Sequence, residues 1–91
     1  MGREKVLFKN EEKMSAGEAA EMLRIIASKV EKGKVTLVRG NKETKLKIPE
    51  RVEVEIKAEE EVGKNRTKRK LEVEIEWLVG DQKKQQPVSI K

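Results

Sequence analysis

The feature that most constrains this chain is an alternation of apolar and charged residues over residues 51–79. The apolar positions are Val52, Val54, Ile56 and Ala58, and then Leu71, Val73, Ile75, Trp77 and Val79. Successive side chains of a β-strand point to opposite faces, so this two-residue period predicts two strands with one apolar and one charged face. The polar segment 63–66 between them predicts a hairpin loop.

Residues 15–33 carry a helical period instead. The apolar residues recur at steps of three and four, at Ala16, Ala19, Ala20, Leu23, Ile26, Ala27 and Val30. One apolar stripe of this kind predicts an amphipathic helix. Ser15 and Glu18 have the spacing of a capping box at its start, and Gly33 suits a left-handed end. We therefore expect a helix of 17 residues over 16–32.

Three shorter β-prone segments, 6–8, 34–38 and 44–48, complete the pattern. The predicted fold class is α+β, with one helix packed in two layers on a five-stranded, mainly antiparallel sheet and the element order β-α-β-β-β-β. The first strand is expected antiparallel beside the last strand, with a parallel place beside 34–38 as the alternative. The helix stripe then covers the apolar face of the sheet.

The outward charges predict the register, because opposite charges facing across a ladder stabilise it and like charges do the reverse. A hairpin through Pro49 gives the pairs Lys47–Glu53, Lys45–Glu55 and Glu43–Lys57. A last hairpin with Val62 facing Thr67 gives Glu61–Lys68, Glu59–Lys70 and Lys57–Glu72, together with the like pairs Glu55–Glu74 and Glu53–Glu76. Each exposed pair contributes about 0–1 kcal/mol, so charge specifies alignment while the apolar face supplies stability.

Length and composition narrow the class of protein. The chain has 91 residues, 43% of them charged, with a net charge of +5 and no cysteine or histidine. We expect a single domain over 1–79 and a flexible polar tail over 80–91. Without thiol, imidazole or phenol groups we expect no enzyme, no metal site and no cofactor. No apolar run approaches the roughly 18–20 residues of a membrane span, so a cytoplasmic protein without a membrane partner is expected.

A basic run is the main candidate binding site. Residues 64–70 hold five cations and no acid, at Lys64, Arg66, Lys68, Arg69 and Lys70. At a hairpin tip such a run would bind nucleic-acid phosphates without reading sequence. The alternative is a solvated tip whose Lys68 and Lys70 pair with Glu61 and Glu59. Phe8 and Trp77 are the only aromatic residues, so base stacking has little support.

Other surfaces have simpler expected roles. Trp77 is expected as a core anchor on the apolar face, with a partner-docking role as the alternative. The acidic cluster on the open face consists of Glu53, Glu55, Glu74 and Glu76. Because a flat ladder beside lysines encircles a cation poorly, a solvated ladder or an electrostatic docking face is expected there.

Self-association is left open by the same pattern. One helix covers five strands thinly, so a homodimer through a sheet edge is an alternative to a monomer. Leftover apolar residues at Leu7, Val38 and Leu78 offer a second route to a dimer.

The segment 72–77 (EVEIEW), the opening 5–9 (KVLFK) and the helix residues 18–23 (EAAEML) after Met14 and Ser15 resemble the amphi-Trp domain family of archaea and bacteria. The resemblance spans residues 4–78 and implies no catalytic or binding residue for this chain. The expected function is a small non-enzymatic module that docks a protein partner through its sheet edge or charged face. The alternative is a sequence-nonspecific nucleic-acid accessory protein. Abundant lysine and glutamate with one aspartate, Asp81, is typical of thermophilic proteins.

Overall fold

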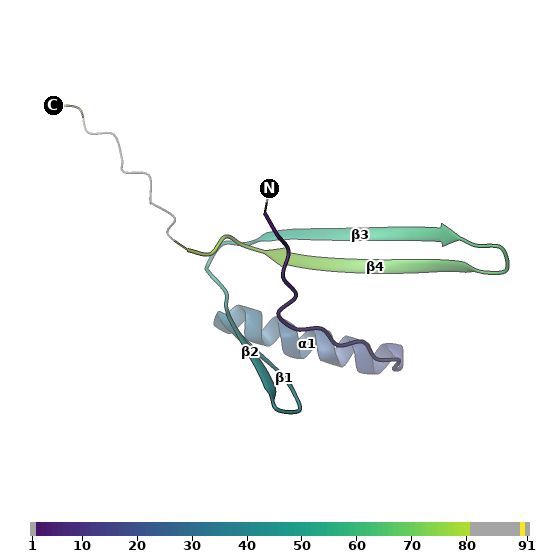
Figure 1. The fold of residues 1–91 in the computed structure, drawn as a ribbon, viewed down its shortest axis with the longest axis horizontal. Coiled ribbons are helices and arrows are strands. Elements are labelled where there is room, and N and C mark those ends of the chain that lie inside the picture. Colours follow the sequence, from purple (N-terminus) through teal and green to yellow (C-terminus); the bar gives the residue numbers. More distant parts are fainter. Residues whose placement is uncertain (1, 81–89, 91) are drawn as a thin grey trace. The chain divides into compact units, whose positions relative to one another are not determined.

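The structure is a computed structural model that describes residues 2–80 and 90. The chain divides after Glu50 into two compact units. The first unit contains α1 (Ala16–Lys32), β1 (Lys34–Arg39) and β2 (Lys42–Lys47), and the second contains β3 (Glu53–Val62) and β4 (Thr67–Glu76). Figure 1 labels these elements along the chain. Each pair of strands forms its own two-stranded antiparallel sheet.

The helix α1 confirms the sequence prediction at both ends. The side chain of Ser15 accepts a hydrogen bond from the Glu18 amide at 3.0 Å, and the Glu18 carboxylate accepts one from the Ser15 amide at 3.3 Å. This reciprocal capping box satisfies two amides that a helix start leaves unpaired. Gly33 ends the helix with φ of 81°, a left-handed conformation that glycine adopts without a Cβ clash.

In the first unit, α1 packs against β1, which continues into β2 through a turn at Gly40 and Asn41. Val35 of β1 is the one buried apolar side chain among residues 2–80 and 90, at 8% exposure. Leu37 and Leu46 of the same small sheet are half-buried. The helix thus packs on the β1 side of a two-stranded hairpin, and the core of this unit is centred on Val35.

The predicted first strand over 6–8 is wrong. These residues belong to no strand, although the segment lies along the β1–β2 hairpin. The Leu7 carbonyl accepts a hydrogen bond from Thr44 Oγ1, and the Lys9 carbonyl accepts one from Arg39 Nη1, both at 3.3 Å. The carbonyls of Leu7 and Lys9 are therefore satisfied by side chains rather than by a backbone ladder.

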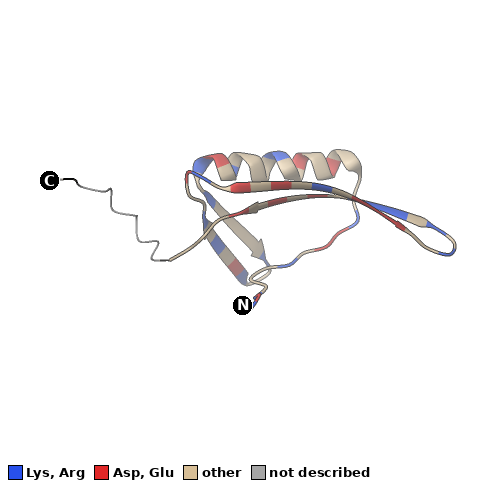
Figure 2. Cartoon of the chain, turned by 90° about the horizontal axis from the view of Figure 1, so that it is seen from above, with Lys and Arg blue, Asp and Glu red and all other residues tan. Residues whose placement is uncertain are grey.

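The second unit is a long hairpin whose register confirms the prediction residue by residue. Val62 faces Thr67, and the ladder runs without a bulge to Glu53 facing Glu76. The predicted complementary pairs and the two predicted like pairs all occupy facing positions. Figure 2 shows the charged bands along both strands. The two-residue period and the outward charges therefore predicted the faces and the alignment of this hairpin correctly.

The predicted five-stranded sheet is also wrong, because β2 and β3 are not paired. The pairs expected through Pro49, Lys47–Glu53, Lys45–Glu55 and Glu43–Lys57, are not formed. Pro49 has no amide to donate, and residues 48–52 lie outside any strand. The Ile48 amide donates instead to the Gly33 carbonyl at 2.9 Å, which extends the β1–β2 pairing. Exposed charge pairs worth about 0–1 kcal/mol each do not by themselves bring two hairpins into one sheet.

The single domain predicted over 1–79 stays a prediction. The predicted tail over 80–91 lies outside the described residues except for Gly80 and Ile90.

Candidate functional site

The tip of the β3–β4 hairpin is a tight loop. The Gly63 amide donates to the Arg66 carbonyl at 2.8 Å, which leaves Lys64 and Asn65 at the turn. A Cβ on Gly63 would lie 3.0 Å from the Arg66 carbonyl oxygen, a crowded contact that glycine avoids. The loop therefore presents charged side chains from a fixed backbone.

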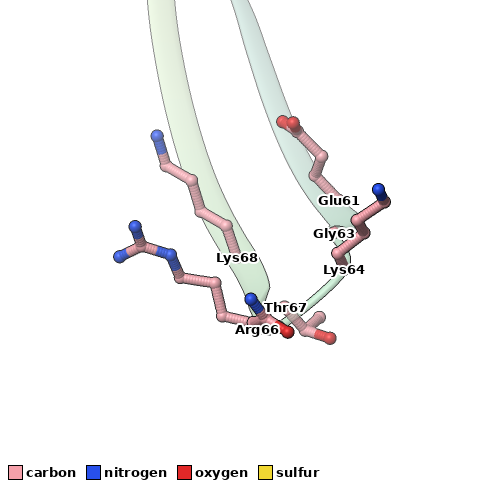
Figure 3. A pocket seen from close by; sticks show the side chains of 7 residues that line it. Glu61, Gly63, Lys64, Arg66, Thr67 and Lys68 are labelled. Atoms are coloured by element: carbon pink, nitrogen blue, oxygen red, sulfur yellow. The ribbon is translucent and has the colours of Figure 1, made fainter.

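An open hollow lies at this tip. Its lining residues are Glu61, Gly63, Lys64, Asn65, Arg66, Thr67 and Lys68. In the view of Figure 3, the side chains of Arg66 and Lys68 extend to one side of the tip, away from Glu61. Within residues 2–80 and 90, Lys64, Arg66 and Lys68 form no ion pair. The structure thus places three of the five predicted cations together at one end of the hairpin.

The other two predicted cations are engaged by carboxylates. Arg69 Nε lies 2.9 Å from Glu60 Oε1 on the facing strand, and Lys70 Nζ lies 2.9 Å from Glu72 Oε1 on its own strand. Arg69 also belongs to the opposite face of the hairpin from Lys68 and Lys70, since side chains alternate along a strand. The predicted set of five is therefore split into an unpaired group of three and two paired residues.

A network of charges runs along the ionic face above the tip. Lys57 Nζ lies 2.8 Å from Glu59 Oε1. The hydrogen bond with Glu59 raises the pKa of Lys57, and the bond with Glu72 raises the pKa of Lys70. The hydrogen bond from Lys57 and then the charges of Lys57 and Lys70 lower the pKa of Glu59. The pKa shifts of Lys57, Glu59 and Lys70 thus all favour the charged form of the group.

The acidic end of the same face behaves in the opposite way. The negative charge of Glu55, directly across the ladder, is the largest cause of a raised pKa at Glu74, and partial desolvation adds to it. Glu76 and Glu72 contribute in the same direction. Among the described residues, no three Asp, Glu, His or Cys side chains are arranged to hold a metal ion. The carboxylates at the acidic end therefore repel one another.

The apolar face of the hairpin is largely exposed. Ile56 is 71% exposed and Leu71 is 74% exposed, while Val54 and Val73 each expose more than half of their surface. Trp77 lies one residue past the end of β4 and is half-buried. Its predicted role as a core anchor stays a prediction. The leftover apolar residues Leu7, Val38 and Leu78 are all exposed.

Sequence reasoning missed some of these contacts. The Arg69–Glu60 pair follows from the predicted register, which places Glu60 opposite Arg69, and the charge of both residues was the available signal. The pairs along one strand, Lys57 with Glu59 and Lys70 with Glu72, replace the expected cross-strand contact of Lys70 with Glu59. That choice depends on side-chain rotamers, which the residue pattern does not specify.

These features define a small α+β protein with a helix-covered hairpin and a long amphipathic hairpin. The family model of the Amphi-Trp domain matches residues 1–91, and the chain belongs to this family. No curated protein and no solved structure matches the chain. In the part of the chain that the structure describes, no helix has the length and apolar character needed to cross a membrane.

Proposed function

We propose that this chain is a non-enzymatic interaction module that docks a protein partner through the sheet edge or the charged face of the β3–β4 hairpin. The observation that carries the proposal is the exposure of most apolar side chains of the hairpin, with 71% at Ile56, 74% at Leu71 and more than half at Val54 and Val73. Contiguous exposed apolar residues beside charged ones are typical of protein interaction surfaces. The proposal involves no catalytic residue, metal or cofactor, and cytoplasmic localisation stays a prediction.

The backbone of the hairpin supports the same proposal. A two-stranded hairpin is marginally stable in water by itself, and each of its strands has one unpaired edge. A partner that adds a strand would satisfy these amides and carbonyls, and would cover apolar side chains at the same time.

Site-specific photo-crosslinking in cells would test this function. A photoreactive residue replaces Ile56 on the apolar face of β3, and a matched control replaces Glu31, an exposed residue of α1. We expect discrete protein adducts from position 56 and none at comparable yield from position 31. Equal yields at both positions, or no protein adduct at position 56, would contradict the proposal.

A second candidate function is sequence-nonspecific binding of nucleic acid by the hairpin tip. It is favoured by Lys64, Arg66 and Lys68, which line one hollow and form no ion pair among the described residues. Each phosphate contact releases a counterion, so binding of this kind weakens steeply with salt. Arg69 and Lys70 contribute less, because Glu60 and Glu72 already neutralise them.

Titration of fluorescent DNA and RNA at two salt concentrations would test this second function. The variant K64A/R66A/K68A removes the unpaired cations, and K9A/K13A/K42A removes three exposed cations from the first unit as a charge-matched control. We expect the first variant to lose most of the affinity and to flatten its salt dependence. No binding at low salt, or equal losses in both variants, would exclude the tip as a nucleic-acid site.

A further inference from the structure

We propose that β4 pairs antiparallel with β4 of a second copy of this chain, about a two-fold axis at Leu71, to form a four-stranded sheet from two hairpins. This inference rests on the proposed function, because it names the partner that occupies the hairpin edge. Three features of β4 support it: its free backbone edge, its charge pattern and the contrast with β3.

The outer edge of β4 has a defined set of free backbone groups. The Gly63 amide donates to the Arg66 carbonyl, so these two residues point toward each other across the loop. Inward and outward backbone groups alternate along an antiparallel strand, so the even-numbered residues of β4 point toward β3. The outer edge is therefore formed by Thr67, Arg69, Leu71, Val73 and Ile75. None of them is a proline, and all five amides are available to another strand.

The charges on the ionic face divide β4 into two halves. Toward the tip lie the cations Lys68 and Lys70, with Arg66 directly before the strand, and away from the tip lie the carboxylates Glu72, Glu74 and Glu76. An antiparallel partner with Leu71 on the two-fold axis reverses this order. The facing pairs are then Arg66 with Glu76, Lys68 with Glu74, and Lys70 with Glu72, each formed twice. Every facing pair on the ionic side is complementary.

Other alignments of β4 with itself are worse. A shift of two residues places Lys70 opposite Lys70 in one direction and Glu72 opposite Glu72 in the other. A shift of one residue would turn the apolar face of one copy against the ionic face of the other. Parallel pairing in register places every charge opposite its own kind. The sequence of β4 thus selects one antiparallel register.

The strand β3 has no such register. Its ionic face carries one cation among four carboxylates, at Glu53, Glu55, Lys57, Glu59 and Glu61. Every antiparallel alignment of β3 with itself therefore places a carboxylate opposite another. Pairing through β4 alone is isologous and closes as a dimer, whereas alternating contacts between β3 and β4 edges would build an open array.

The pairing also accounts for the two like pairs within the hairpin. Glu74 faces Glu55, and Glu76 faces Glu53, which is unfavourable in an isolated hairpin. In the dimer, Lys68 and Arg66 of the second copy lie on the other side of Glu74 and Glu76. On the opposite face, Leu71 meets Leu71 of the second copy and extends the apolar surface across the axis.

Charge-reversal variants of the full chain separate this pairing from hairpin stability. In E74K/E76K, the new lysines face Glu55 and Glu53 within the hairpin, which they relieve, but face Lys68 and Arg66 of the second copy. The control E53K/E55K makes the same change of net charge and relieves the same two pairs, but lies on β3. By sedimentation equilibrium, we expect dimers of the wild-type chain and of E53K/E55K. For E74K/E76K the dimer dissociation constant should rise at least about tenfold, since four complementary pairs become repulsive.

A mixing experiment completes the test. The variant R66E/K68E replaces the cations on the other side of the same pairs by carboxylates. An equimolar mixture with E74K/E76K therefore restores all complementary pairs and should form a heterodimer. A wild-type chain that is monomeric at millimolar concentration, equal weakening by E74K/E76K and E53K/E55K, or no heterodimer in the mixture would each overturn the pairing. The proposed function is tested separately. If the chain is monomeric but position 56 forms adducts with a different protein, the dimer is excluded and the proposed function still stands.

Discussion

Both hairpins of this protein are antiparallel, but they differ in how much of their apolar surface is buried. The β1–β2 hairpin has strands of six residues and a helix packed on β1, and it buries Val35. The β3–β4 hairpin has strands of ten residues, and none of the residues in these two strands is buried. The shorter hairpin therefore has a covering layer, while the longer one has a more extensive ladder of charges.

This difference shows which interactions hold a sheet and which only align it. Burial of apolar surface contributes about 25 cal/mol per Å², whereas exposed ion pairs contribute about 0–1 kcal/mol each. The long hairpin is thus specified in register but not strongly stabilised by its own side chains. A partner that covers the long hairpin would bury its apolar side chains, as α1 does for β1.

Among the tests of this comparison, the substitution Val35→Ala should have the largest effect on stability. Removing two buried methyl groups should lower the free energy of unfolding of the first unit by about 2 kcal/mol, from lost transfer energy and the cavity left behind. Denaturant unfolding followed by the helical circular dichroism signal measures this loss. The control Val38→Ala, on the same strand but 61% exposed, should have a much smaller effect. Similar losses for both variants would contradict a core centred on Val35.

A somewhat smaller effect is expected from Gly33→Ala. Gly33 has φ of 81°, and a Cβ there would lie 3.3 Å from the Ile48 carbonyl oxygen. The left-handed conformation should cost about 1–2 kcal/mol for alanine. Gly17→Ala, within the first turn of α1, should change stability in the opposite direction by about 0.5–1 kcal/mol. Thermal unfolding of both variants gives the two signs, and a neutral Gly33→Ala would show that the helix end is not held in this conformation.

The smallest expected effect is on the pKa values of two glutamates in the charged ladder of the long hairpin. By carboxyl-carbon NMR at low protein concentration, Glu74 should titrate above its ordinary pKa of 4.5 and Glu59 below it. A raised pKa means that the folded hairpin binds the Glu74 proton more tightly, so this contribution to stability is present below pH 4.5 and is lost as pH rises through the folded pKa. Glu59 has the opposite sign, with stability that is lost as pH falls through its lowered pKa.

Glu55→Gln should return the pKa of Glu74 toward its ordinary value, because the charge of Glu55 is the largest cause of the shift. At high protein concentration, dimer formation would bring Lys68 of the second copy beside Glu74 and lower its pKa. A Glu74 pKa that is unchanged by Glu55→Gln would contradict the ladder geometry.

Local structure was predictable from the sequence because residue spacing and residue chemistry within short segments favour the same conformation. The capping box at Ser15, the left-handed Gly33 and the pairing of Val62 with Thr67 each follow from spacing and chemistry within a short segment. The neighbours of each strand were not predictable in the same way. A two-residue period specifies the two faces of a strand, but it does not specify which other strand lies at its edge.

The same limit applies to the candidate site. The cluster of five cations was visible in the residues, but only part of its division was, because the predicted register places Glu60 opposite Arg69. Arg69 and Lys70 are neutralised by Glu60 and Glu72 through side-chain geometry, whereas Lys64, Arg66 and Lys68 remain together at the tip. The segment 6–8 is not a strand: Thr44, distant in sequence, satisfies the Leu7 carbonyl, and Arg39 satisfies that of the adjoining Lys9.

The contact between Ile48 and Gly33 has a consequence for chain length. Gly33 ends α1 and is followed directly by the first residue of β1. Its carbonyl accepts a hydrogen bond from the Ile48 amide at 2.9 Å. An insertion or deletion at this junction would rotate the helix relative to the strand by roughly 100° per residue and displace Val35 from its cover. Related chains should therefore keep a fixed spacing here, while the turn at Lys64 and Asn65 can accept additional residues.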